Sequence, residues 1–108
     1  MALLEVDLVE LEGIEPDFTA ADADGDEFPN TGRVIFIVDN GSGDPITVSF
    51  TEQRPCNYNH DVPVEVSVPA GDKLWFGPFS PARFNDDNGR VHVGYSDVTT
   101  VTVAAVGV

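Results

Sequence analysis

The sequence is short of basic residues, cysteine and long apolar runs. Its 108 residues include five Lys and Arg against nineteen Asp and Glu, which gives a formal net charge of -14 and a pI near 4.1. A surface this acidic repels nucleic-acid phosphates and anionic lipid headgroups. The composition therefore argues against a general nucleic-acid binder or membrane-surface binder.

Cysteine occurs once, as Cys56, so no intrachain disulfide can form and the disulfide-stapled secreted scaffolds are excluded. Residues 1–11 have neither the basic leading region nor the unbroken apolar stretch of a signal peptide. No run of about eighteen apolar residues occurs in the chain either. We therefore expect a soluble, unprocessed protein.

The chain is rich in carboxylates, but its content of apolar residues is that of a protein that folds. Hydrophobic residues make up 42% of the chain and aromatic residues 9%, too much for a disordered acidic segment. Lys73 is the only lysine. Such a composition is typical of proteins in concentrated salt, where a Debye length of ~3 Å at ~1 M screens carboxylate repulsion. We expect a halophilic source; an acidic protein of an ordinary cytoplasm is the alternative.

The acidic residues are unevenly distributed along the chain. Ten of the nineteen precede Arg33, whereas residues 33–108 carry nine acids and all five bases, a net charge of -4. We therefore predict an acidic N-terminal arm and loop at residues 1–32 and a β-sandwich domain at residues 33–108. Alternating apolar and acidic residues predict an edge strand over 3–11, and a long loop follows over 13–32 because Gly13 and Pro16 interrupt a helix.

The rest of the chain is a series of short strand patterns. The apolar run VIFIV at residues 34–38 suits a central strand, and the turn sequence NGSGDP separates it from the alternating residues 46–51, which predicts a hairpin. Further strands are expected at 64–68, 74–76, 91–95 and 100–105, the first at a sheet edge because Pro63 precedes it. About seven strands with little helical periodicity predict an all-β fold, either an antiparallel sandwich or a small barrel.

Two oxygen-rich stretches are the calcium candidates. Asp22, Asp24 and Asp26 have the spacing that opens a calcium-binding loop, but the glycine comes two positions early and Arg33 stands where a bidentate glutamate belongs. We therefore favour a solvated acidic loop over a calcium site. The second stretch, NDDN before Gly89, has the composition of an ordinary turn.

The soft metal ligands are Cys56, His60 and His92, and no spacing in the sequence pairs them. His92 lies in the polar phase of its strand, which favours an exposed side chain over a zinc ligand. There is no nucleophile elbow, no helix start beside Cys56 and no glycine-rich anion cradle. We predict that the protein is not an enzyme and has neither a cofactor nor a metal.

Aromatic residues gather around Gly77 and Pro78, and aromatics near loops can fill a partner's pocket or stack on sugars. We expect Phe76 and Phe84 in the core. Trp75 lies in the opposite phase from Phe76, so it is the candidate for an exposed anchor.

The strings FPNTGRVIFIVDNGSGDPITVSF, VSVPAG, GPF and FNDDNGRVHVGYSDVTTVTVAAV occur in this order between residues 28 and 106. In this order they resemble small β-rich proteins encoded among the head genes of tailed phages and haloarchaeal tailed viruses. The matching pieces are strand and turn sequences without a catalytic motif. The resemblance thus implies a fold and a virion setting more firmly than a place in the particle.

The resemblance implies a decoration or turret protein that binds the major capsid protein on the head surface after synthesis in the host cytoplasm. Decoration proteins bind at symmetry axes, which implies a homo-oligomer such as a trimer or pentamer. The expected partner-binding residues lie in the N-terminal arm and the aromatic loop: Leu4, Val6, Leu8, Leu11, Trp75 and Phe79. A head-to-tail connector or neck component and a carbohydrate or cell-surface binding module are the alternatives.

Overall fold

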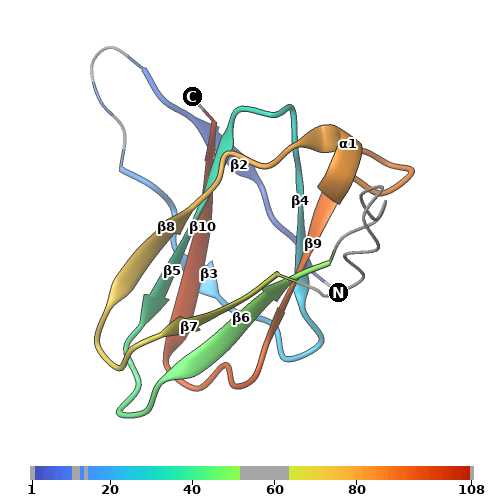
Figure 1. Cartoon of the computed structure of the whole chain (residues 1–108). Coiled ribbons are helices and arrows are strands. Elements are labelled where there is room, and N and C mark those ends of the chain that lie inside the picture. Colours follow the sequence, from blue (N-terminus) through green and yellow to red (C-terminus); the bar gives the residue numbers. More distant parts are fainter. Residues whose placement is uncertain (1, 11–12, 14, 52–63, 108) are drawn as a thin grey trace.

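Two packed β-sheets form the protein in the computed structural model, which describes residues 2–10, 13, 15–51 and 64–107 (Figure 1). Within these residues the strands are β1 (Ala2–Leu3), β2 (Val6–Leu8), β3 (Thr19–Ala20), β4 (Asp26–Pro29), β5 (Val34–Asn40), β6 (Ile46–Phe50), β7 (Val64–Val68), β8 (Lys73–Phe76), β9 (Arg90–Tyr95) and β10 (Val101–Gly107). One short helix, α1 (Pro81–Phe84), lies in the loop before β9.

The first sheet has the strand order β1-β4-β9-β6-β7, and the second has the order β2-β10-β5-β8 with β3 also paired to β10. The predicted all-β sandwich is confirmed. Its pairing is antiparallel except at β1 with β4 and at β2 with β10, which are parallel. The expected edge strand at residues 64–68 is β7, at one edge of the first sheet.

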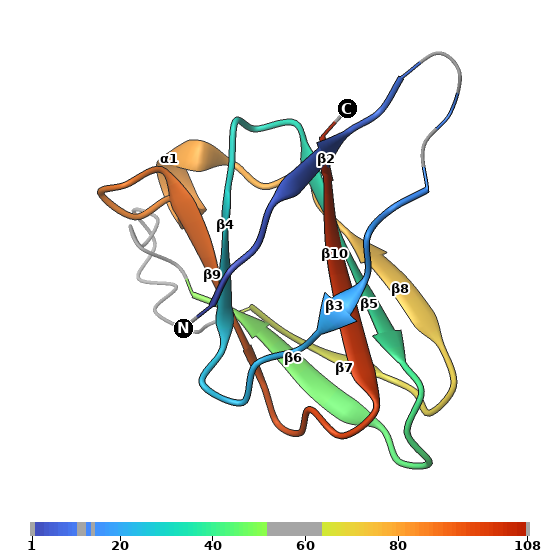
Figure 2. The same cartoon turned by 180° about the vertical axis from the view of Figure 1, so that it is seen from behind.

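The N-terminal segment joins the two sheets. The chain pairs with β4 through β1, crosses at Leu4, and then pairs with β10 through β2, as Figure 2 shows. The Leu4 N–H donates to the Glu27 carbonyl at 2.8 Å, and the Val9 N–H donates to the Gly107 carbonyl at 2.8 Å. Residues 2–8 are thus part of the sandwich, unlike the separate arm that the sequence predicts.

The expected loop over 13–32 contains two further strands, β3 and β4. Phe28 on β4 is fully buried, and its ring stacks on that of Phe36 with 5.1 Å between ring centroids. The sequence did not predict this strand, because it has only four residues and Phe28 is preceded by several acidic residues. A boundary at residue 32 therefore separates regions of different charge, and both regions supply strands to the same two sheets.

The predicted hairpin of residues 34–38 with 46–51 is wrong. Both segments are strands, but β5 pairs with β10 and β8 in the second sheet while β6 pairs with β7 and β9 in the first. Asn40 is buried at the crossing, and its side-chain Nδ2 donates to the carbonyls of Asp44 and Val68 at 2.9 and 3.1 Å. Turn-forming residues reverse the chain, but they do not determine which sheet the next strand joins.

The core lies between the sheets and is rich in phenylalanine. Phe79 occupies its centre, with ring centroids 4.9 Å from Phe50 and 5.5 Å from each of Phe28 and Phe84. Phe84 is buried on α1, and Phe76 packs against the core from β8, so both expectations of core positions are confirmed. Burial of several large rings is the main driving force for this fold.

Candidate functional site

The residues expected to bind a partner fall into two groups. Leu8 and Trp75 are exposed, with 72% and 65% of their surface accessible, and Val6 is half-buried. Leu4 and Phe79 are buried at 9% and 5% accessibility, so neither presents an exposed surface for a direct partner contact. Leu4 covers the crossing between sheets, and Phe79 fills the aromatic core. Leu11 lies outside the described residues.

Trp75 lies on a strand with one open edge. Among the described residues, β8 pairs with β5 alone, and Trp75 stands opposite Ile37 in that pair. Its side chain has the opposite phase from Leu74 and Phe76, which pack against the core. Trp75 therefore projects from the outer face of the second sheet.

The outer face of the second sheet is apolar at its centre. Ile37 is fully buried and pairs with Ala104, and Ile35 pairs with Val106 beside it. Ile37, Ala104 and Val106 are buried without belonging to the core cluster between the sheets. The chain ahead of β3 crosses β10 on this side (Figure 2), and the ring of Phe18 lies 4.9 Å from Lys73 Nζ on β8. The acidic N-terminal region thus covers part of this face and leaves Trp75 at its margin.

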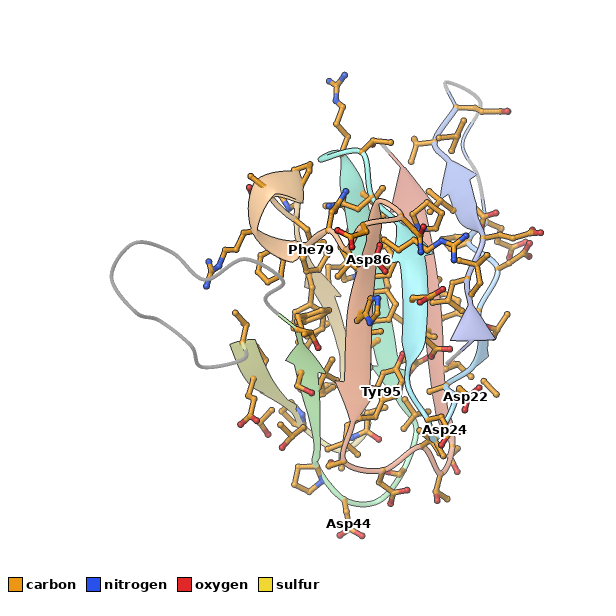
Figure 3. All side chains as sticks on the ribbon, turned by 90° about the vertical axis from the view of Figure 1, so that its right-hand side faces the viewer. Asp22, Asp24, Asp44, Phe79, Asp86 and Tyr95 are labelled. Atoms are coloured by element: carbon orange, nitrogen blue, oxygen red, sulfur yellow. The ribbon has the colours of Figure 1, made fainter. Side chains whose placement is uncertain are left out.

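The aspartates of the predicted calcium loop take different positions. Asp22 and Asp24 lie at the surface of a turn in which the Asp24 N–H donates to Asp22 Oδ1 at 2.9 Å (Figure 3). Asp26 instead points into the sandwich and is fully buried. Among the described residues, the His, Cys, Asp and Glu side chains that lie close enough together to share a metal ion do not include these aspartates; they are Glu27, Asp86 and His92. The sequence expectation of a solvated loop is thus wrong for Asp26.

Asp26 accepts a hydrogen bond from the Tyr95 hydroxyl at 2.6 Å, and its Oδ1 atom is buried without a hydrogen-bond partner. Burial raises the pKa of Asp26, and the Tyr95 hydrogen bond opposes that rise. Burial and the neighbouring carboxylate together raise the pKa of Tyr95. Tyr95 therefore stays neutral and donates, which partly compensates the buried acid.

A pocket of about 440 Å³ lies beside Asp26, between the N-terminal segment and β10. Four acidic residues line it, together with an apolar wall of leucine, valine and alanine side chains; the acids are Glu5, Asp7, Asp17 and Asp26. The Asp17 N–H donates to Asp7 Oδ2 at 3.0 Å and ties the two N-terminal stretches together. The pocket is thus lined by acidic side chains on the N-terminal side and by apolar side chains along β10.

Three side chains converge on the outer face of the first sheet: Glu27, Asp86 and His92. His92 Nε2 lies 2.6 Å from Asp86 Oδ2 and 3.6 Å from Glu27 Oε2. The hydrogen bond with His92 is the main cause that lowers the pKa of Asp86. Asp86 lies at the α1 end of the sandwich in Figure 3, on the loop that leads into β9.

Reasoning from the sequence missed this cluster. It placed His92 on the polar face of a strand, where it lies, but expected exposure, whereas the side chain is about three-quarters buried at 25% accessibility. The sequence could suggest a link between Asp86 and His92 because they are close along the chain. Glu27 is far away in sequence, and only the pairing of β4 with β9 brings it to His92. Cys56 and His60, the other soft ligands, lie outside the described residues.

Comparison of the chain with known protein families, with curated proteins and with solved structures gives no match. Among the described residues, no helix has the length and apolar character needed to cross a membrane.

Proposed function

We propose that the protein is a structural, non-enzymatic module that binds the outside of a tailed-virus head through the edge of β8 around Trp75. One observation carries the choice of surface: a tryptophan is 65% exposed on a strand whose outer edge has no partner among the described residues. Tryptophan is enriched among the residues that dominate interface energies.

The backbone of β8 offers a second mode of attachment at the same place. An edge strand presents N–H and C=O groups that an extended segment of a partner can pair with. Lys73 lies 4.0 Å from Asp39 on β5, so the charges at this edge are of both signs. A capsid protein that supplies a strand and a pocket for the indole ring would satisfy both features.

The N-terminal segment is less suited to strand addition than its sequence suggests. Its backbone already pairs with β4 and β10, so donation to another protein would open this protein's own sandwich. The exposed side chain of Leu8 remains free to make a contact at the rim of an interface. We therefore assign the main attachment to Trp75.

The virus head as the location rests on the resemblance of residues 28–106. The partner in this proposal is the major capsid protein, and a homo-oligomer at a symmetry axis would multiply weak contacts through a four-residue strand. The large carboxylate excess suits particles that assemble in concentrated salt.

The test is sedimentation of the purified protein with heads that lack it. We expect Trp75→Ala to weaken binding about 30-fold, the effect of a hot-spot residue of about 2 kcal/mol. Leu3→Ala is the matched control, because it removes another exposed apolar side chain, 52% accessible, that has no part in the proposed contact. Equal binding of Trp75→Ala and the unmodified protein would contradict the proposed surface.

Copy number separates the positions in the particle. Hundreds of copies per head indicate decoration, whereas about a dozen indicate a ring-shaped connector, as closed symmetry requires. Binding to a glycan array that depends on Trp75, without binding to heads, would favour the carbohydrate-binding alternative instead.

A further inference from the structure

We propose that Glu27, Asp86 and His92 form a binding site for a first-row divalent metal ion, with Zn²⁺ as its representative. The three ligand atoms all lie within 4.8 Å of one another. The set combines one imidazole with two carboxylates, the kind of mixed ligand set that zinc accepts with further positions open to water. This site is on the first sheet and is separate from the Trp75 surface.

The backbone holds two of the ligands in fixed positions. Glu27 and His92 stand directly opposite each other in the antiparallel pair of β4 and β9. Side chains at such positions start about 5 Å apart on the same face of the sheet. Ligands on paired strands are held more precisely than ligands on loops.

The third ligand is held by its own turn. Asp86 Oδ1 accepts the N–H groups of Asn88 at 2.8 Å and Arg90 at 3.0 Å. These bonds leave Asp86 Oδ2 facing His92 Nε2 at 2.6 Å. One carboxylate oxygen therefore orients the side chain while the other is presented to the shared centre.

Glu27 is divided in the same way between its two oxygens. Oε1 accepts a hydrogen bond from Arg90 at 2.9 Å, while Oε2 lies 3.6 Å from His92 Nε2, beyond hydrogen-bonding distance. Partners behind the ligands that fix their orientation are a regular feature of metal sites. The two carboxylates and Arg90 sum to one negative charge, so a divalent cation meets net attraction.

The distances require only small side-chain movements. Ligand bonds of ~2.0–2.2 Å place tetrahedral ligand atoms roughly 3.3–3.6 Å apart. The contact between His92 and Asp86 is shorter than this, and that between His92 and Glu27 already matches it. A proton on His92 Nε2 can bridge to only one carboxylate, whereas a metal ion contacts both.

The ligand types select the metal. Imidazole suits Zn²⁺, Ni²⁺ and Cu²⁺, whereas Ca²⁺ and Mg²⁺ prefer all-oxygen sites with more ligands. We therefore expect Zn²⁺, Ni²⁺ or Cu²⁺ to bind and Ca²⁺ not to compete at equal concentration. This preference distinguishes the site from general attraction of cations to an acidic protein.

The experiment is calorimetric titration of the full chain with Zn²⁺, after removal of metals, at ~1 M NaCl to suppress nonspecific attraction. We expect one ion per chain, and at least ~10-fold weaker binding for His92→Gln, Asp86→Asn and Glu27→Gln, since even residues behind the ligands matter by ~10–100-fold. Asp87→Asn, the same change at the neighbouring exposed residue, is the control and should bind like the original protein.

The two histidines provide a readout that is independent of these variants. In the His60→Gln chain, the ring nitrogen signal that shifts on Zn²⁺ addition must be that of His92. Unchanged binding in His92→Gln, an equal loss in Asp87→Asn, or binding abolished by Cys56→Ser and His60→Gln would each overturn the proposal. Should a variant fail to fold, an unshifted His92 signal in the His60→Gln chain at saturating Zn²⁺ would also overturn it.

Discussion

The outer faces of the two sheets differ in chemistry, because the central strands β5 and β10 of the second sheet are apolar on both faces whereas those of the first sheet alternate. The first sheet presents charged and hydroxyl side chains, among them Glu27, His92 and Thr47. The second presents Ile37 and Ala104, which are buried, with Trp75 exposed at the margin. A face whose apolar centre is covered by its own chain yet leaves a large ring exposed is suited to a protein partner, whereas a polar face on rigid strands is suited to a small ligand.

The inner and outer faces of the first sheet also differ in how they accommodate a carboxylate. Asp26 and Glu27 are neighbours on β4, but Asp26 is buried against Tyr95 while Glu27 pairs with Arg90 at the surface. Burial makes the Asp26 carboxylate unfavourable, whereas Glu27 is only partly buried and its charge is paired with that of Arg90. The comparison predicts that substitutions on the covered apolar face and in the interior lower the free energy of unfolding most, and that substitutions at the margins of the sheets lower it least.

The largest effect is expected at the covered face of the second sheet. Ile37→Ala should lower the free energy of unfolding by about 2–5 kcal/mol, the range for a truncated buried side chain. Thr47→Ala, at an exposed outer position of the first sheet, should change it by no more than ~0.5 kcal/mol. Urea denaturation measures both. Similar small values for the two variants would show that the outer face of the second sheet is not covered.

Tyr95→Phe should lower the free energy of unfolding by about 1–3 kcal/mol, because it removes the hydroxyl that donates a hydrogen bond to the buried Asp26 carboxylate. Urea denaturation of the single variant and of the same change in an Asp26→Asn background measures the coupling. We expect Tyr95→Phe to lower the free energy of unfolding less in that background, because a neutral Asn side chain is less destabilised by the missing hydrogen bond than a buried carboxylate is. The same loss in both backgrounds would mean that the hydroxyl stabilises the fold independently of Asp26.

The pH dependence of stability should distinguish the acid inside the sheet from the one outside it. Because the pKa of Asp26 is raised above 3.8 in the folded protein, its contribution to stability declines as pH rises through the folded pKa. Because the pKa of Asp86 is lowered, its contribution is present above 3.8 and is lost as pH falls through the folded pKa.

Denaturation between about pH 3 and pH 7 measures these slopes. Relative to the unmodified protein, Asp26→Asn should gain stability as pH rises, whereas Asp86→Asn should lose it. Slopes of the same sign for both variants would contradict the contrast between the interior and the outer face.

The smallest effect is expected at the margin near Trp75. Lys73→Met removes a charge 4.0 Å from Asp39 and 4.9 Å from the Phe18 ring but keeps an apolar side chain. We expect a loss of less than about 1 kcal/mol, as for exposed ion pairs and cation–π contacts. Thermal denaturation at low and high salt measures it. A larger loss would mean that Lys73 holds the covering segment in place.

Strand positions in the second half of the chain were predictable because period-2 alternation is a local property. The segments expected as strands at 46–51, 64–68 and 91–95 correspond to β6 (Ile46–Phe50), β7 (Val64–Val68) and β9 (Arg90–Tyr95). The exposure of Trp75 was predictable for the same reason, since its phase is opposite to that of Phe76. The burial of Phe79 was not, because it lies in an irregular segment whose side-chain directions follow from the loop geometry alone.

The sequence by itself determined an all-β chain with an acidic N-terminal region, because composition and apolar alternation are local properties of the sequence. Only the tertiary structure decided which sheet each strand joins, that residues 2–8 close the sandwich, and that Glu27 meets Asp86 and His92. These outcomes depend on pairing between segments far apart in sequence, and burial of the shared core selects that pairing rather than any turn or spacing along the chain.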